Sequence, residues 1–97
     1  MINIIDMYLP NYKVIIKNNY ACINDKTLLL TEEDKENIIR EIRVWKDEYR
    51  GKALEKTEYY IRIYNNADLL RTHLFNGAFP ENFNNLLEIV GDLYDRS

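Results

Sequence analysis

The spacing of apolar residues switches along this chain between a period of two and a period of about 3.6, and this order constrains the fold most. Residues 12–17 and 20–23 are rich in β-branched side chains and are separated by Asn18-Asn19, which predicts a two-stranded hairpin. A helical stripe follows, and the same succession recurs over residues 59–97. The chain is therefore expected to be an α+β protein of order β-β-α-β-β-α, with an antiparallel sheet and two amphipathic helices on one face.

The first helix is expected from about residue 32 to about residue 50. Thr31 is a good N-cap, and Asp34 three residues later makes a weaker version of the capping box. Gly51 is a natural residue to end the helix. Five apolar residues follow one helical stripe: Ile38, Ile39, Ile42, Trp45 and Tyr49.

The second half begins after a polar connection over residues 51–58. Residues 59–64 alternate strictly, with Ile61 and Ile63 on one side of the predicted strand. Asn65-Asn66 turns the chain, residues 69–75 return it, and Pro80 suits the first position of a second helix. The stripe of that helix is Phe83, Leu86, Leu87, Val90, Leu93 and Tyr94.

The 97 residues are enough for one domain. It divides into an N-terminal arm or strand at 1–11, a first half at 12–50 and a second half at 59–97, with a further short strand expected near 27–30. The apolar pattern of the first strand matches that of residues 59–64 when it is shifted by 47 residues, and the pattern of the first helix matches that of the second when it is shifted by 48. A duplication explains this internal pseudo-repeat, and so do the shared periods of any two such units.

The composition of the chain limits its expected cellular location and the kinds of partner it can bind. There are 13 Lys and Arg against 16 Asp and Glu, for a net charge of -3, which disfavours binding driven by nucleic-acid phosphates. One cysteine and the lack of a signal peptide or a membrane-length apolar run predict a cytoplasmic protein. Heavy use of Asn, Ile, Lys and Tyr indicates an AT-rich genome, as in low-GC bacteria, their phages or mobile elements.

Catalytic chemistry finds little support in the sequence. Cys22 and His73 are the only candidates for a nucleophile and its base, and a buried inert thiol with a surface histidine is the simpler interpretation. Metal-ligand spacings and a glycine-rich phosphate loop are absent from the sequence. We therefore expect no enzyme, no cofactor and no metal, and an enzyme using Cys22 and His73 is only a third hypothesis.

The strongest candidate site is an aromatic and basic patch. Tyr60, Arg62 and Tyr64 project from one face of a predicted strand, and a suitable pairing puts Arg71, His73 and Phe75 of the next strand on that face. Tyr and Arg are enriched in the residues that dominate protein interfaces, although Tyr is also ordinary on an open sheet face. The predicted partner-binding residues are Tyr60, Arg62, Tyr64, Arg71 and His73.

These features predict a small non-catalytic module that binds another protein. An inhibitor or antagonist, of the kind that phages, mobile elements and immunity loci use, fits a compact acidic chain of this composition. A single-stranded nucleic-acid binder that stacks bases on the aromatic patch is the alternative. Edge strands of the sheet would also allow two copies to pair as a homodimer.

Overall fold

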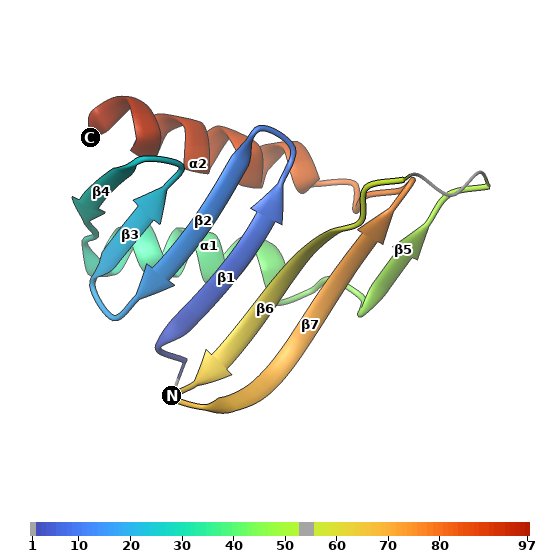
Figure 1. Ribbon diagram of the computed structural model, residues 1–97, viewed down its shortest axis with the longest axis horizontal. Helices are drawn as coiled ribbons and strands as arrows, with labels where there is room; N and C mark the ends of the chain where they lie inside the picture. The colour runs from blue at the N-terminus through green and yellow to red at the C-terminus, as the bar shows by residue number, and fades with distance from the viewer. Residues whose placement is uncertain (1, 53–55) are drawn as a thin grey trace.

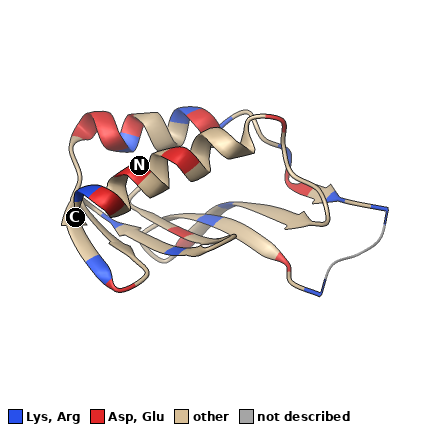
Figure 2. Cartoon of the chain, turned by 90° about the horizontal axis from the view of Figure 1, so that it is seen from above, with Lys and Arg blue, Asp and Glu red and all other residues tan. Residues whose placement is uncertain are grey.

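The computed structural model describes residues 2–52 and 56–97, which form one seven-stranded sheet and two helices. Both helices lie on the same face of the sheet (Figures 1 and 2). The α+β class predicted from sequence is confirmed, with more strands than expected. The elements are β1 (Ile4–Leu9), β2 (Tyr12–Lys17), β3 (Tyr20–Ile23), β4 (Lys26–Leu29), α1 (Glu32–Ile42), β5 (Glu48–Arg50), β6 (Tyr59–Asn65), β7 (Asp68–Asn76) and α2 (Phe83–Arg96).

The strands lie in the order β4-β3-β2-β1-β6-β7-β5, and β5 against β7 is the parallel pair. β1 is therefore the central strand, hydrogen-bonded to β2 on one side and to β6 on the other. The N-terminal segment, which the sequence left open as an arm or a strand, is thus the strand that joins the two halves. Its inward side chains Ile5, Met7 and Leu9 are buried.

Each antiparallel hairpin within the described sheet turns at an asparagine in the left-handed region. Asn11, Asn18, Asn24 and Asn66 have φ values of 70°, 55°, 53° and 54°. Asparagine tolerates this conformation because its short polar side chain bonds the local backbone. The turns predicted at Asn18-Asn19, at residues 24–26 and at Asn65-Asn66 are confirmed.

The start of α1 follows the sequence prediction. The Thr31 backbone N–H donates to Asp34 Oδ2 at 2.9 Å, and the Asp34 N–H donates to Thr31 Oγ1 at 3.1 Å. Arg96 Nη2 at the end of α2 also donates to Asp34 Oδ2, at 2.6 Å. The hydrogen bond from Arg96 holds the pKa of Asp34 below its ordinary value. One carboxylate therefore caps α1 and ties the end of α2 to it.

The predicted extent of the first helix is wrong, because α1 ends at Ile42 and not near residue 50. Three tertiary bonds draw the following chain out of the helix. Arg71 Nη2 donates to Trp45 O at 2.6 Å, Trp45 Nε1 donates to Asn82 Oδ1 at 2.6 Å, and the Leu74 N–H donates to Asp47 O at 2.8 Å. Tertiary contacts thus override a helical apolar pattern that was correct for only its first half.

Tyr49 therefore belongs to β5 and not to a helix. Its ring stacks on Phe75 of the neighbouring β7 with 5.8 Å between centroids. The polar connection predicted for residues 51–58 has no regular helix or strand at 51–52 and 56–58, and its residues 53–55 lie outside the described part of the chain.

The second helix begins at Phe83, three residues later than the prediction from Pro80. Residues 80–82 form a turn, in which the Phe83 N–H donates to Pro80 O at 3.0 Å. The Asn82 side chain does not cap the helix. It accepts from Trp45 and donates to Glu41 Oε2 at 2.6 Å, so it connects the two helical segments.

The core fills the space between the sheet and the two helices. Trp45, Phe75 and Phe83 form its aromatic centre, with ring centroids 5.2–5.8 Å apart. The predicted stripe of α2 is confirmed at Phe83, Leu86, Val90 and Leu93, which are all buried. Within residues 2–52 and 56–97, neither helix has the length and apolar character to cross a membrane.

The two halves contribute unequally to this fold. The first half, residues 12–50, supplies β2, β3 and β4 before α1 and β5 after it, whereas the second half supplies β6 and β7 before α2. The pseudo-repeat stays a prediction.

Candidate functional site

Residues 2–52 and 56–97 leave one face of the sheet uncovered, since both helices pack against the other face (Figure 2). We call it the open face and define it by strand register, which places paired residues on the same side. Three rows of side chains cross it from β4 or β2 toward β7. They are Leu29, Tyr20, Lys17, Ile4, Tyr64 and Leu69; then Thr27, Cys22, Ile15, Asp6, Arg62 and Thr72; then Lys13, Tyr8, Tyr60 and Leu74.

Tyr60, Arg62 and Tyr64 lie on the open face, as the alternation in the sequence predicts. The intervening Ile61 and Ile63 are buried beneath the helices. The Arg62 guanidinium sits over the Tyr60 ring, with 4.2 Å between Cζ and the ring centroid. Tyr8 of β1 lies beside it, 5.9 Å from Tyr60 between centroids. An arginine over a tyrosine ring gains about 0.5–1 kcal/mol of attraction at an exposed site.

The expectation that Arg71 and His73 share this face is wrong. His73 pairs with Ile61 and Arg71 pairs with Ile63, so both lie on the side of the helices, and His73 is 0% exposed. A bulge causes the difference, because Tyr64 pairs with Leu69 but Ile63 pairs with Arg71, which leaves Leu70 as an extra residue. Without that extra residue, the register of the hairpin end would continue and put Arg71 opposite Arg62.

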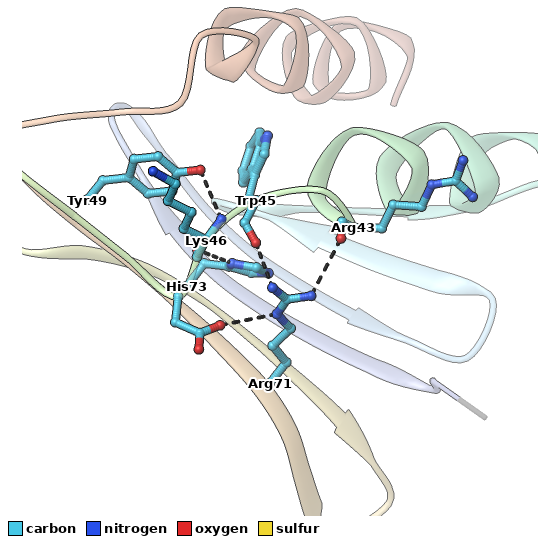
Figure 3. A network of polar contacts seen from close by, with 7 residues as sticks. Arg43, Trp45, Lys46, Tyr49, Arg71 and His73 are labelled. Atoms are coloured by element: carbon cyan, nitrogen blue, oxygen red, sulfur yellow. Dashed lines mark hydrogen bonds and ion pairs between the residues drawn. The ribbon is translucent and has the colours of Figure 1, made fainter.

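Arg71 instead holds the segment between α1 and β5 (Figure 3). Besides its bond to Trp45 O, its guanidinium donates to Arg43 O at 3.5 Å and pairs with Asp47 Oδ1 at 3.3 Å. His73 Nδ1 lies 2.7 Å from Lys46 O. These two side chains fix the backbone of residues 43–47 against β7.

The buried His73 gives a testable pH dependence. Burial lowers the pKa of His73 below its ordinary 6.5, the bond to Lys46 O opposes this, and the charge of Arg71 adds to it. The unfolded chain therefore takes up a proton at higher pH than the folded one. We expect the free energy of unfolding to fall as the pH drops below about 6.5, by at most about 1.4 kcal/mol per pH unit. Urea titrations between about pH 5 and pH 7 measure this.

His73 is the one histidine of the chain, and histidine is the side chain whose ordinary pKa lies in this window. A His73→Asn variant should therefore show a flat profile in the same window. A wild-type profile as flat as that of the variant would show that folding does not change the pKa of His73.

The sequence reasoning missed the part of the open face that lies on β1 to β4. On these strands, Ile15, Tyr20 and Leu29 are 44%, 58% and 63% exposed, and Leu69 on β7 is 54% exposed. The alternation in residues 12–17 indicated that Lys13, Ile15 and Lys17 share one side of β2. It did not indicate that β1 lies between β2 and β6, which places these residues on the same face as Arg62.

Unpaired cations accompany these apolar residues. Lys13, Lys17 and Arg62 make no ion pair with any residue in the described ranges. The helices differ in charge from the sheet (Figure 2): α1 and α2 together carry eight Asp and Glu against three Lys and Arg. Acidic residues thus predominate on the helices, whereas the described rows of the open face carry the cations Lys13, Lys17 and Arg62 against the single carboxylate of Asp6.

Cys22 and His73 do not meet. Cys22 is exposed on the open face, contrary to the burial expected from its residue type, and His73 is buried on the opposite face. The sheet itself separates them, so they do not form a nucleophile and base pair. Across residues 2–52 and 56–97, no three His, Cys, Asp or Glu side chains gather in a way that would hold a metal ion.

Comparison of the chain with protein-family models, with curated proteins and with solved structures gives no match.

Proposed function

We propose that this protein is a non-catalytic module that binds a partner protein through the open face and inhibits it by covering its surface. The observation that carries the proposal is the open face itself, a full side of a seven-stranded sheet without any cover from the described chain. A hydrogen-bonded sheet is already ordered before binding. It therefore loses little conformational entropy when it docks, which favours a rigid blocking surface.

The side chains of this face have the character of a protein interface. Ile15 and Tyr20 are exposed, the Tyr8 ring contacts Tyr60 in a tilted arrangement, and Arg62 lies over the Tyr60 ring. Exposed apolar residues that form a continuous patch mark interaction surfaces, and Tyr and Arg supply much of the binding energy there. Tyr60 and Arg62 are accordingly the anchors of the proposed interface.

Charge defines the partner surface further. Lys13 and Lys17 flank Ile15 on β2, and Arg62 lies on the other side of Asp6 in the same row. None of the three cations makes an ion pair within the described residues. The partner is therefore expected to offer an apolar patch with carboxylates around it, because complementary charge speeds association and selects the orientation.

A single-stranded nucleic acid is the alternative occupant, supported by the stacked Tyr60 and Arg62. Two features favour a protein instead. Aliphatic side chains at Ile4, Ile15 and Leu69 offer no planar surface for stacking bases. The acidic helices also repel a polyanion, whose affinity depends on many phosphate contacts.

The experiment compares the wild type with a Tyr60→Ala/Arg62→Ala double variant in capture from a low-GC bacterial lysate. A partner that binds through the open face should be retained by the wild type after nuclease treatment and lost by the variant. With the purified partner, the variant should bind at least about 2 kcal/mol more weakly, about thirtyfold in affinity, because both anchors are removed. Calorimetry of the purified pair measures this difference.

The matched control is Arg40→Ala/Glu88→Ala, which removes an arginine and another charged side chain from exposed positions on the helices. It should bind like the wild type. Lys17→Glu, at an exposed open-face position, reverses a charge without touching the core and should also weaken binding. Equal binding by all variants would reject the open face. Loss of capture on nuclease treatment would favour nucleic acid, and concentration-dependent dimers whose formation the open-face variants abolish would make a second copy the occupant.

A further inference from the structure

A cavity lies on the other side of the sheet from the open face, between α1 and the strands β6 and β7. Its volume is about 250 Å³, and its walls are mostly apolar. A cavity of roughly 150 Å³ is enough to hold benzene, so this one has room for a substituted ring or a short branched chain. The apolar walls are Ile2, Ile39, Ile42, Ile63 and Leu70, and the polar lining residues are Arg43, Arg71 and His73.

His73 is one of the residues that line this cavity, and one of its ring nitrogens is buried. Nδ1 lies 2.7 Å from Lys46 O, and a carbonyl oxygen only accepts, so Nδ1 carries the proton. In a neutral ring Nε2 is then an acceptor. Nε2 is buried and makes no hydrogen bond to any of residues 2–52 or 56–97. A buried acceptor without a hydrogen bond lowers the stability of the folded protein. A ligand that donates a hydrogen bond to this acceptor removes that cost, which favours its binding.

Arg71 lines the same cavity and supplies the opposite kind of group. Three of its five guanidinium N–H groups are used, toward Asp47, Arg43 O and Trp45 O. Its positive charge is close enough to oppose protonation of His73. The polar end of the cavity therefore combines a neutral acceptor with N–H donors. Only a group that both donates and accepts can satisfy the two together, and a carboxylate cannot donate to Nε2.

We propose that this cavity binds a small apolar molecule with one hydroxyl group, of the size and chemistry of a phenol. The hydroxyl donates to His73 Nε2 and accepts from Arg71, and the apolar body of the ligand contacts the isoleucine walls. The site goes beyond the proposed binding of a partner protein, because it lies on the opposite side of the sheet.

Methyl NMR of isoleucine-labelled protein tests the proposal, with phenol and toluene as the two probes. They are matched in shape, and toluene has a methyl in place of the hydroxyl. Phenol should shift the methyl signals of Ile39, Ile42 and Ile63, while Ile15 on the open face and Ile23 at the far side of the core stay unchanged. Phenol should bind about tenfold more tightly than toluene, because only phenol supplies the missing donor.

Two variants complete the test. His73→Asn keeps an N–H near the position of Nδ1 but removes Nε2, so phenol and toluene should then bind equally. Ile39→Phe fills the cavity, and both probes should lose affinity. Should His73→Asn fail to fold, the comparison of probes in the wild type and in Ile39→Phe still decides.

Three results would overturn the proposal. Unchanged methyl signals at millimolar phenol would mean that water alone occupies the cavity. Equal affinity of the wild type for phenol and toluene would mean that Nε2 does not select a donor. Tighter binding of benzoate than of phenol would mean that the arginines select an anion instead.

Discussion

A Trp45→Ala variant is expected to lose about 3–5 kcal/mol of the free energy of unfolding, a large part of the total for a domain of this size. Trp45 is 2% exposed, and its ring lies 5.7 Å from Phe75 and 5.8 Å from Phe83 between centroids. The variant would leave a cavity at the aromatic centre of the core. It would also remove the indole donor to Asn82, the residue that connects the segment after α1 to the start of α2. Urea denaturation followed by circular dichroism measures the loss.

The neighbouring Val44 provides the control, because its side chain is 73% exposed. A Val44→Ala variant should unfold within about 0.5 kcal/mol of the wild type. Trp45→Phe should fall between the two, since it keeps a ring but lacks the indole N–H. A loss below about 1 kcal/mol in Trp45→Ala would show that the core does not depend on this side chain.

A Gly51→Ala variant is expected to destabilise the protein by about 1–3 kcal/mol, through overpacking of one backbone against another. A Cβ at Gly51 would lie 2.4 Å from the carbonyl oxygen of Gly77 and 2.8 Å from its carbon. These are backbone atoms, so no side chain can rotate away. The Gly51 N–H also donates to Asn76 O at 2.8 Å, a bond that would lengthen as the chains separate.

The same substitution at Gly91 should have the opposite sign. A Cβ there meets the Tyr12 hydroxyl at 3.1 Å, and the end of a side chain can move by the small distance required. Alanine also has a better helix propensity than glycine by up to about 1 kcal/mol, so Gly91→Ala should leave stability unchanged or raise it. Both variants retain Trp45, the one tryptophan of the chain, as a fluorescent probe of unfolding. Similar losses in the two variants would reject the close approach at Gly51.

Local sequence patterns were sufficient to predict those elements whose structure depends on residues within the element or its turn. The hairpin of β2 and β3, the alternation of β6, the turn at Asn65-Asn66 and the start of α1 at Thr31 were all predictable. Each depends on β-branched residues, on asparagines in the left-handed region or on a capping pair, and none requires knowledge of a distant partner.

The failures concern contacts between elements. The length of the first helix depends on bonds from Arg71 and Asn82, which are distant in the sequence. The faces of Arg71 and His73 depend on one extra residue, Leu70, in the return strand. Alternation predicts which residues of one strand lie on the same side of the sheet. A single bulge shifts the pairing with the neighbouring strand by one residue, so the residues beyond it lie on the opposite face from the one expected. The predicted site was therefore right in placing Tyr60, Arg62 and Tyr64 together and wrong in adding the next strand to them.

The central position of β1 also determines the order in which the molecule assembles. β1 to β4 and α1 are joined by short connections, so their pairings close quickly, before the rest of the chain is needed. The second edge of β1 is expected to pair later, with β6, because pairing Ile5 with Ile63 closes a loop that contains the whole of the first half. During synthesis, β1 to β4 are therefore expected to emerge while one edge of β1 is unpaired. The delay until β6 and β7 emerge is the interval in which nascent chains are most exposed to mispairing with one another.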